Sequence, residues 1–577
     1  MIQLNYLQRC MILKMLNFKT KLNVLRNKTP SLSLATFNLF IALWLGLILN
    51  ISFFEKISLL TPYDGIKAQL LLIAAVVIVI AIYNLVLQIL TWTWTTKAIA
   101  IILVVLGGFS SYFVSNFGVI INSDQIQNMV QTDSREIRDL LSVKYVLWTL
   151  SFVILPVLVI LFIRINPEPF LTILWKKIAI SGVSMVIVAG LLFSFYIDFA
   201  SIFRENRELK GMISPQNVIA GSLSYYRKKI PKENLPLVRY GEDAHLSQQV
   251  GMSQKLPKLM VLVVGETARA ESFSLNGYKK NTNPELSKQN IINFSQVSSC
   301  GTATAVSVPC MFSGMSRENY DEQLASHREG LLDIAQRAGY KVTWIDNNSG
   351  CKGACDRVEA YQIPVDIRKK WCDASGECLD EVLVDSLQRY ISDIPKEDDT
   401  PRLIVLHQMG SHGPAYYKRA TKEFQKFNPT CKTNEIQGCT STELINTYDN
   451  SIVYTDHVLS TIIEVLKDKS QYQTGFWYLS DHGESTGENG MYLHGAPYAI
   501  ASSQQTHIPM LMWFSPQWEK ENMTKISCLI DQKHKELSHD NLFPTLLSLL
   551  DINSSTIDQK LNMLDQCEVN GRKEKIL

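Results

Sequence analysis

Val261-Leu262-Val263-Val264 is a short apolar run that leads directly into Gly265-Glu266-Thr267, and the same pattern recurs three times along the chain. The other instances are Thr343–Ile345 followed by Asp346-Asn347-Asn348, Leu403–Leu406 followed by His407-Gln408-Met409-Gly410-Ser411-His412-Gly413, and Phe476–Leu479 followed by Ser480-Asp481-His482-Gly483-Glu484. Short runs rich in β-branched and aromatic residues are typical of buried strands. Because ligands of open α/β sheets bind just beyond the carboxyl ends of strands, we expect the four loops to converge. Their Glu, Asp and His residues are metal-ligand types, so the sequence predicts a metallo-enzyme.

The first part of the chain has a different composition from the part that holds these strands. The chain has 577 residues and a formal net charge of +2, which predicts more than one domain and gives no indication of a nucleic-acid partner. Crossing a bilayer takes ~20 predominantly apolar residues, and five runs without internal charges reach that length. They are Ala35–Phe54, Ala68–Leu90, Ala98–Ile121, Tyr145–Ile163 and Ile178–Ile197. A buried helical core is the alternative, but uncharged runs of this length are rare in soluble proteins.

The basic residues beside these runs predict their orientation, because cytoplasmic flanks carry an excess of Lys and Arg. The segment before the first run has six basic residues and no acid: Arg9, Lys14, Lys19, Lys21, Arg26 and Lys28. The turn before the fifth run holds Arg164, Lys176 and Lys177. With both segments cytoplasmic, an odd number of spans places the C-terminal part on the outer side of the membrane.

Three regions follow from this pattern. Residues 1–197 form a transmembrane domain with five spans, residues 198–257 a connection, and residues 258–577 an exported domain. The connection begins with Phe199-Ala200-Ser201-Ile202-Phe203-Arg204, which predicts an interfacial helix followed by an extended linker. A plain solvated connector fits the same composition equally well.

Cysteine placement gives a separate test of this topology. Ten of the 11 cysteines lie in the C-terminal part, and most form close pairs: Cys300 with Cys310, Cys351 with Cys355, Cys372 with Cys378, and Cys431 with Cys439. Disulfides persist in oxidising compartments, so a paired set indicates a domain outside the cytoplasm. A zinc cluster of cysteines is the rival interpretation, but the spacings do not resemble a repeated C-x₂-C array. Cys528 and Cys567 remain, and their pairing with each other is inferred only by elimination.

The best candidate for a nucleophile lies in the stretch Ser299-Cys300-Gly301-Thr302-Ala303-Thr304, which leads into an apolar run. Small hydroxyl residues after a glycine are typical of a helix N-terminus, where free N–H groups favour an anion. A hydroxyl becomes a useful nucleophile when a metal lowers its pKa. One zinc ion bound by Glu266, Asp481, His482 and a threonine oxygen would do this. A plain helix cap is the ordinary alternative.

Taken together, these motifs resemble the bacterial phosphoethanolamine transferases that modify lipid A, the group that includes the mobile colistin-resistance enzymes. The resemblance rests on Val264–Arg269, Cys300–Phe312, His407–Pro414 and Ser480–Ser485, and it spans nearly the whole chain. Asn348–Asp356 contains a cysteine pair that makes it more similar to the chromosomal lipid A enzymes than to the mobile ones. The resemblance implies five spans, a linker and a periplasmic domain with the α/β/α fold of alkaline phosphatases and sulfatases. It also implies a multi-pass protein of the Gram-negative inner membrane, expected to be a monomer.

The same resemblance implies roles for individual residues. Glu266, Thr304, Asp481 and His482 would bind the catalytic zinc, with Thr304 as the nucleophile and Thr302 as its competitor. His412 and His494 match positions near the phosphoryl group, as substrate ligands or ligands of a second zinc ion, and His407 is a less certain third histidine. Five residues match positions around the lipid head group: Asn128, Thr132, Glu136, Ser349 and Lys352. A short helix over the loop 122–144 would place Asn128, Thr132 and Glu136 on one face; a solvated surface helix is the ordinary explanation.

The implied reaction has two steps. Thr304 attacks the phosphorus of phosphatidylethanolamine, diacylglycerol leaves, and an acceptor then takes the phosphoethanolamine, with His412 or His494 as a base. The acceptor stays open among a lipid A phosphate, a core heptose, another glycan and a protein. A lipoteichoic-acid-type phosphoglycerol transferase is the enzymatic alternative. A sulfatase is disfavoured because Val308-Pro309-Cys310-Met311 lacks the arginine of the formylglycine motif, and a non-catalytic sensor would not need a full metal set.

Overall fold

The computed structural model describes residues 30–61, 63–132, 134–229, 235–247, 256–374 and 376–565. The chain forms two compact units, one made of Met1–Asn116 with Val143–Ala220 and the other of Phe117–Ser142 with Gly221–Leu577. The segment between the third and fourth spans therefore belongs to the C-terminal unit. The sequence predicts three regions, 1–197, 198–257 and 258–577. In the structure, residues 198–220 group with the transmembrane helices, while Phe117–Ser142 groups with residues far along the chain.

The predicted five spans are present in the described part of the chain. The helices long and apolar enough to cross a membrane are Leu34–Leu60 (α2, Leu34–Gly46, and α3, Ile51–Leu60), Gly65–Leu90 (α4), Thr96–Phe117 (α5), Val143–Phe162 (α8, Val143–Thr149, and α9, Leu155–Phe162, joined by a π-helical turn) and Phe170–Ser194 (α10). A short parallel pair, β1 (Ser31–Leu32) with β2 (Arg164–Ile165), joins the chain before the first span to the turn after the fourth.

The bounds of several spans differ from the expectation, and the first ends at Leu60 rather than Phe54. The third helix ends at Phe117 rather than Ile121, and the fifth begins at Phe170 rather than Ile178. Lys177 therefore lies inside α10, where its ammonium donates to the carbonyl oxygen of Thr91 at 2.5 Å and lies 4.0 Å from the centre of the Trp92 ring. A long lysine side chain is tolerated near the end of a span when its charged head finds such partners.

The segment after the fifth span is more helical than the expected interfacial helix and extended linker. Helix α11 (Tyr196–Glu205) is followed by a 3₁₀ turn (Arg207–Met212) and a second helix, α12 (Gln216–Lys229). Between them, the amide of Ser214 donates to Asn50 Oδ1 at 2.8 Å, and Asn50 Nδ2 donates to the Ser214 carbonyl at 2.9 Å. Paired polar groups of this kind hold the returning chain against the first span.

The C-terminal unit contains a seven-stranded sheet in its described residues, in the order β5-β13-β10-β4-β9-β7-β8. The strands β10, β4, β9, β7 and β8 run parallel, while β13 and β5 are added in antiparallel pairs at the edge. The four predicted strands are β4 (Lys258–Gly265), β7 (Lys341–Asp346), β9 (Arg402–His407) and β10 (Gln473–Ser480). The strands at the two edges of the sheet are β5 (Ile292–Phe294) and β8 (Glu359–Ala360), and β13 (Met510–Phe514) lies between β5 and β10.

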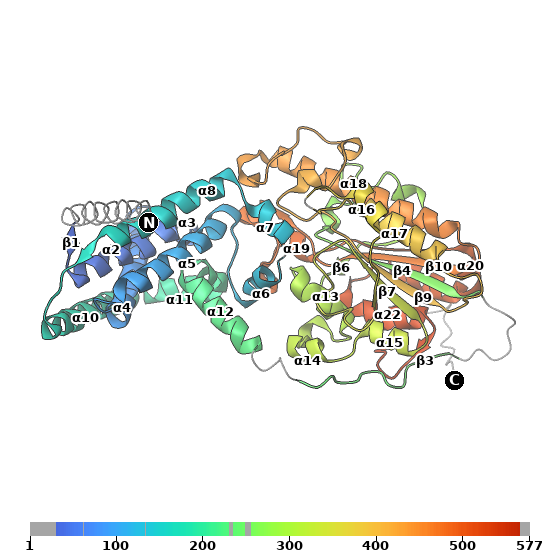
Figure 1. The fold of residues 1–577 in the computed structure, drawn as a ribbon, viewed down its shortest axis with the longest axis horizontal. Helices are drawn as coiled ribbons and strands as arrows, with labels where there is room; N and C mark the ends of the chain where they lie inside the picture. Colours follow the sequence, from blue (N-terminus) through green and yellow to red (C-terminus); the bar gives the residue numbers. More distant parts are fainter. Residues whose placement is uncertain are drawn as a thin grey trace, which may run out of the picture. The chain divides into compact units, whose positions relative to one another are not determined.

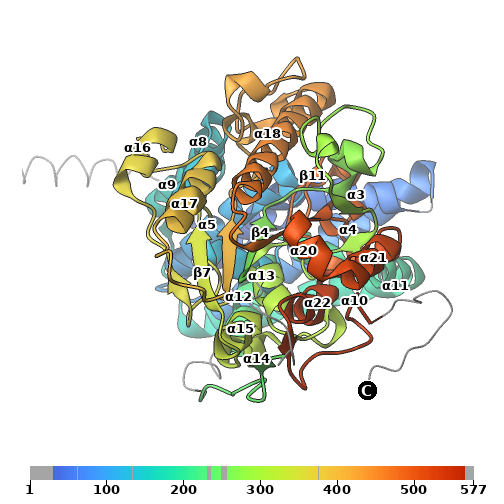
Figure 2. The same cartoon turned by 90° about the vertical axis from the view of Figure 1, so that its right-hand side faces the viewer.

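Helices cover both faces of this sheet, which gives the predicted α/β/α sandwich. Figures 1 and 2 show α17 (Glu381–Ser392) and α18 (Ser441–Lys467) on one side, and α15 (Leu331–Arg337) and α22 (Leu542–Leu549) on the other. Every residue of β4 is buried, and Met260, Leu262 and Val264 join the core under α15 and α22. A parallel strand that is covered on both faces is apolar along its whole length.

The remaining elements lie around this sandwich. The helices are α6 (Ser123–Gln131), α7 (Ser134–Leu140), α13 (Thr304–Phe312), α14 (Glu322–His327), α16 (Val365–Trp371), α19 (Ser503–Thr506), α20 (Pro516–Glu521) and α21 (Met523–Gln532). Short strand pairs are formed by β11 (Ser485–Thr486) with β12 (Tyr492–Leu493), β14 (Leu537–Ser538) with β6 (Val297–Ser298), and β15 (Ile552–Asn553) with β3 (His245–Leu246).

The cysteines of the C-terminal unit are joined in close pairs. In the described residues, disulfides connect Cys300 with Cys310, Cys351 with Cys355, Cys372 with Cys378, and Cys431 with Cys439. Cys528 is also disulfide-bonded, and its partner expected by elimination, Cys567, lies outside the described residues. These bonds agree with an oxidising compartment for this unit.

We expect thiol labelling to report this pattern. A maleimide added to the denatured, non-reduced protein should leave these disulfide-bonded cysteines unmodified, and prior reduction should make them reactive. Intact-mass measurement counts the added labels. Labelling of any of the eight cysteines in the four described disulfides without reduction would contradict the assignment.

Candidate metal centre

The four predicted loops meet at the carboxyl ends of neighbouring parallel strands. Strands β10, β4, β9 and β7 are neighbours, and their register pairs Leu479 with Val264, Val264 with His407, and His407 with Asp346. The polar residues that follow these positions therefore leave the sheet at the same level. This convergence is what the strand pattern predicted.

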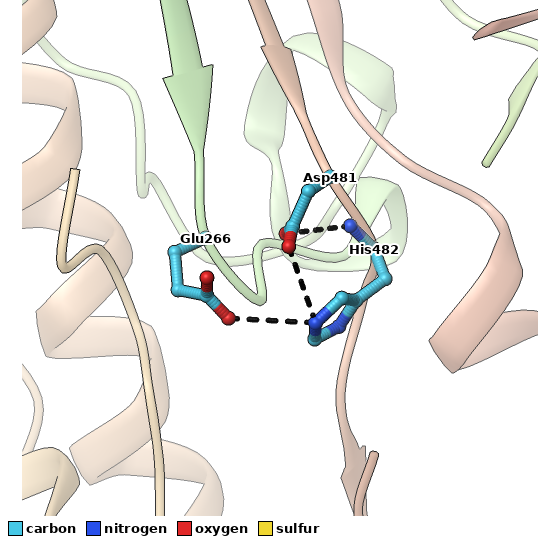
Figure 3. Close-up of side chains that lie close together, drawn as sticks. All are labelled: Glu266, Asp481 and His482. Atoms are coloured by element: carbon cyan, nitrogen blue, oxygen red, sulfur yellow. Dashed lines mark hydrogen bonds and ion pairs between the residues drawn. The ribbon is translucent and has the colours of Figure 1, made fainter. Parts of the chain in front are cut away.

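Glu266, Asp481 and His482 form a compact cluster at these strand ends (Figure 3). Their ligand atoms lie within 4.8 Å of one another, and all three side chains are buried. His482 Nε2 lies 3.4 Å from Glu266 Oε1 and 3.3 Å from Asp481 Oδ2. Two carboxylates and one imidazole thus face a common point.

The protonation state of His482 indicates which kind of ligand fits between these three side chains. Burial lowers the pKa of His482 well below its usual range, so the ring is neutral at neutral pH. Its Nδ1 lies 2.8 Å from the carbonyl oxygen of Gly483, which makes Nδ1 the donor and leaves a lone pair on Nε2. That lone pair faces the carboxylate oxygens of Glu266 and Asp481, and such an arrangement is favourable only around a cation or a proton.

The carboxylates support the same conclusion. Glu266 Oε1 and Asp481 Oδ2 are buried and have no hydrogen-bond partner in the described part of the chain. Burial raises the pKa of Glu266 well above its usual range, with a further increase from Asp481, and burial raises the pKa of Asp481 to about 7. A divalent cation would relieve both the desolvation and the repulsion. The residues therefore fit a metal ion with nitrogen and oxygen ligands.

The Thr304 hydroxyl lies beside this cluster. Thr304 is the first residue of α13, and its Oγ1 lies 3.0 Å from Glu266 Oε2 and 3.3 Å from His482 Nε2. Thr302, two residues earlier, instead donates its hydroxyl to the carbonyl oxygen of Ala496 at 2.6 Å. The two threonines therefore differ in surroundings, and Thr304 is the one that faces the metal ligands.

Asn348 is a member of the site that sequence reasoning did not single out. Its Nδ2 donates to Glu266 Oε2 and to the carbonyl oxygen of Gln408, both at 2.8 Å, so it joins two of the four loops. The available signal was its place in Asp346-Asn347-Asn348 at the end of β7.

Two of the predicted histidines lie next to the cluster. The rings of His482 and His494 are 4.5 Å apart, and those of His494 and His412 are 5.3 Å apart. His494 Nδ1 is 2.8 Å from Glu484 Oε2; burial opposes its charging, but the Glu484 carboxylate raises its pKa to about 9. Burial lowers the pKa of His412 well below its usual range, with His494 adding to the effect.

The third histidine, His407, is placed differently. It is fully buried, and its Nδ1 lies 2.8 Å from Asp346 Oδ1. Hydrogen bonding to His407 outweighs the effect of burial and lowers the pKa of Asp346. This pair connects the ends of β9 and β7.

The loop between the third and fourth spans reaches the same region, but it does not form one helix. Helix α6 ends at Gln131, and Thr132 has an extended backbone (φ −64°, ψ 133°), so the expectation of a single helical face is wrong. Thr132, Asp133 and Ser134 are residue types that favour the start of a new helix over continuation. Glu136 falls in α7, and its side chain lies outside the described residues.

The contacts of this loop involve several of the other predicted residues. Lys352 Nζ donates to Ser349 Oγ at 2.8 Å and to the carbonyl oxygen of Gln131 at 3.4 Å. Gln127 Nε2 donates to the carbonyl oxygen of Ala305, next to Thr304, at 3.4 Å. Asn128 lies in α6 between these two contacts, and the loop therefore forms one side of the site.

Comparison with known proteins identifies the family. A family model described as phosphoethanolamine transferase EptA/EptB matches residues 79–230, and a sulfatase model matches residues 258–552. Phosphoethanolamine transferase EptA of Escherichia coli (strain K12) is 43% identical over 547 residues, which is 94% of this chain and 98% of that protein. The chain belongs to the phosphoethanolamine transferase family.

Two further relatives agree. Phosphatidylethanolamine transferase Mcr-1 of Escherichia coli is 34% identical over 533 residues, or 90% of this chain and 95% of that protein. The integral membrane protein lipooligosaccharide phosphoethanolamine transferase A (EptA) of Neisseria meningitidis has a similar structure, with a TM-score of 0.88 and 37% identity over 93% of this chain and 99% of that one. With its five apolar helices, the chain is an inner-membrane protein whose catalytic unit lies in the periplasm.

The raised carboxylate pKa values predict how a metal changes stability with pH. Without metal, the folded protein holds protons on Glu266 and Asp481 that the unfolded chain releases above pH ~4, so stability falls as pH rises toward and through the raised pKa values, of which that of Asp481 is about 7. A bound cation requires both carboxylates to be charged. The difference in melting temperature between metal-loaded and chelator-treated protein should therefore increase from pH ~5 to pH ~8.

Thermal unfolding of the full-length protein in detergent, with and without a chelator, measures this difference. At pH 8, a metal present at 100 times its dissociation constant should add about 2.7 kcal/mol. Asp481→Asn is the control and should reduce the chelator effect. A difference that is independent of pH, or largest at pH 5, would contradict the proposed ligands.

Proposed function

We propose that this chain transfers phosphoethanolamine from phosphatidylethanolamine to lipid A through a covalent intermediate on Thr304. The observation that carries the proposal is the place of the Thr304 hydroxyl, 3.0 Å from Glu266 Oε2 and 3.3 Å from His482 Nε2, in a member of this transferase family. The name of the relative Mcr-1 supports phosphatidylethanolamine as the donor, and the lipooligosaccharide enzyme supports lipid A as the acceptor.

The metal in this proposal is one zinc ion held by Glu266, Asp481, His482 and Thr304. The carboxylate oxygens of Glu266 and Asp481, the imidazole nitrogen of His482 and the alkoxide oxygen of Thr304 are ligand types that suit tetrahedral zinc. Bound there, zinc would lower the pKa of the Thr304 hydroxyl and neutralise charge on the phosphoryl oxygens. Asn348 would hold Glu266 in place through its hydrogen bond, as residues behind metal ligands commonly do.

The first step forms a bond between Thr304 Oγ1 and the phosphorus of the donor. The bond from phosphorus to the glycerol oxygen breaks, and diacylglycerol leaves with a proton. Thr304 then carries phosphoethanolamine as a phosphodiester. The N-terminus of α13 favours this anion because the first amides of a helix have no partners within it.

The second step returns Thr304 to its free form. An oxygen of the acceptor attacks the phosphorus, and the bond to Thr304 Oγ1 breaks. His494 is well placed to exchange protons with the leaving and entering oxygens, because its Nδ1 is bonded to Glu484 and its Nε2 is left for the reacting group. His412, 5.3 Å away between ring centres, is placed to bind the phosphoryl oxygens.

The donor head group would be bound by the loop of α6 and by the turn around Lys352. We propose that Asn128, Thr132, Ser349 and Lys352 contact it, with Glu136 pairing with the ethanolamine ammonium. The contacts from Gln127 to Ala305 and from Lys352 to Gln131 keep this loop beside Thr304. We further propose that the working enzyme is a monomer.

The two neighbouring threonines provide a matched pair of variants. Thr304→Ala removes the nucleophile and should abolish transfer, by 10³-fold or more on an order-of-magnitude basis. Thr302→Ala loses only a hydrogen bond to the Ala496 carbonyl and should keep at least about a tenth of the activity. Mass spectrometry of a trapped phosphoethanolamine adduct on the wild-type peptide gives a direct check. Equal loss in both variants, or an adduct elsewhere, would rule out Thr304.

Cellular resistance tests the acceptor. Phosphoethanolamine adds an ammonium to a lipid A phosphate and weakens the attraction of cationic peptides such as polymyxins. Expression in a susceptible Gram-negative host should therefore raise polymyxin tolerance, and mass spectrometry of lipid A should show added phosphoethanolamine. Both effects should be lost with Glu266→Ala. Modified core sugars with unmodified lipid A would move the acceptor to a core heptose.

A further inference from the structure

A closed ring of four charged side chains holds the loop between the third and fourth spans against the catalytic unit. Asp139 of α7 and Glu377, inside the Cys372–Cys378 loop, face Lys418 and Arg419. Arg419 lies 2.9 Å from Asp139 and also pairs with Glu377, while Lys418 pairs with Asp139 and lies 3.5 Å from Glu377. Each acid is therefore shared by both cations, and the ring is neutral.

The ring is buried where it involves Arg419. The exposed fractions are 5% for the Arg419 side chain and 4% for that of Asp139, compared with 35% for Lys418. Buried charges are retained when they are paired and their donors satisfied. Asn434 Nδ2 also donates to the Asp139 carbonyl at 2.6 Å, so both the side chain and the backbone of this residue are held.

Among the described residues, the Arg419 side chain also hydrogen-bonds outside the ring, to the loop that follows β9. Its Nε donates to the backbone carbonyl oxygen of His412 at 2.8 Å, while its two terminal nitrogens contact Asp139 and Glu377. The planar guanidinium is suited to three partners at fixed angles, which a lysine ammonium on a flexible stem cannot reproduce. In the described residues, Lys418 shares both acids with Arg419 but makes no hydrogen bond to His412.

The other end of the same loop is held by a separate residue. Asp380 accepts hydrogen bonds from the amides of Met409 and Gly410, both at 2.9 Å. His412 lies between this anchor and Arg419. A change at Arg419 therefore alters the backbone at His412 while leaving the anchor at Met409 and Gly410 in place.

We propose that Arg419 is a positioning residue that couples the docking of α7 to the placement of His412. The inference rests on the proposed function, in which the loop 122–144 binds the donor head group and His412 faces its phosphoryl oxygens. Because one guanidinium contacts both segments, α7 and the His412 backbone adopt their working positions together. Binding of the head group by this loop thus favours the aligned state of His412.

Three variants of the full-length enzyme in detergent separate this role from simple stabilisation. Arg419→Lys keeps the positive charge but lacks the planar guanidinium, whose Nε donates to the carbonyl oxygen of His412. Lys418→Gln is the matched control, since it disrupts the same ring without touching His412. Asp139→Asn weakens the link to α7 without changing either residue of the hydrogen bond from Arg419 to His412.

Hydrogen–deuterium exchange tests the coupling without any substrate. Arg419→Lys should increase exchange in peptides that cover residues 411–416, and Asp139→Asn should do the same although it lies in α7. Lys418→Gln should increase exchange in these peptides less than either. Unchanged exchange over 411–416 in Asp139→Asn would overturn the coupling.

Kinetics with phosphatidylethanolamine that carries a fluorescent acyl chain test the positioning. Arg419→Lys should lower kcat by about 10-fold to 100-fold at unchanged metal content, since a misplaced group near the reacting atoms costs rate more than binding. Asp139→Asn should raise KM for the lipid more than it lowers kcat. Equal losses of kcat in Arg419→Lys and Lys418→Gln, at matched melting temperature, would assign the ring a purely structural role. Failure of the wild-type enzyme to convert this lipid would contradict the proposed donor, and the exchange results would still decide the coupling.

Discussion

Two buried carboxylates at the same level of neighbouring parallel strands are the constraint on which the site depends. The register pairs Ser480 of β10 with Gly265 of β4, so Asp481 and Glu266 leave the sheet side by side. Both side chains are almost completely buried, and water cannot screen their repulsion. A cation at this point is the simplest way for the fold to accommodate them, and the neutral His482 with its free Nε2 lone pair completes the set of donors.

The surrounding backbone is arranged to bring the loops this close. A Cβ atom on Gly410, which has φ +53°, would lie 2.4 Å from the carbonyl oxygen of Glu266, so a side chain there is excluded. Tyr448 of α18 donates to the Thr267 carbonyl at 2.6 Å and accepts from the Arg269 amide at 3.1 Å. The loop that carries Glu266 is therefore held by hydrogen bonds to Tyr448 of α18, and it packs closely against Gly410 in the loop after β9.

In the function that we propose, the segment 117–142 connects this chemistry to the lipid donor. It lies between two spans in the sequence, yet it packs within the catalytic unit, where Gln127, Gln131 and Asp139 contact α13, Lys352 and Arg419. A donor that is anchored in the membrane must present its head group to a soluble site. A loop that is anchored at both ends in spans and packed against the catalytic residues meets that requirement.

Local patterns in the sequence determined the spans, the four central strands and the loops that follow them. Apolar run length and strand composition need no knowledge of distant contacts, and they pointed to the loops that hold Glu266, Asp481 and His482, which the structure brings together. The hydroxyl residues after Gly301 pointed to the Thr302–Thr304 stretch as a helix N-terminus. Tertiary structure decided which threonine faces the cluster, because Thr302 is turned away by the Ala496 carbonyl, 194 positions later. It also decided the break at Thr132, the contact of Asn348 with Glu266, and the pairing of Asp139 with Arg419 across 280 positions. Hydrogen bonds and ion pairs between remote segments depend on how the chain packs, and no periodicity within either segment encodes them.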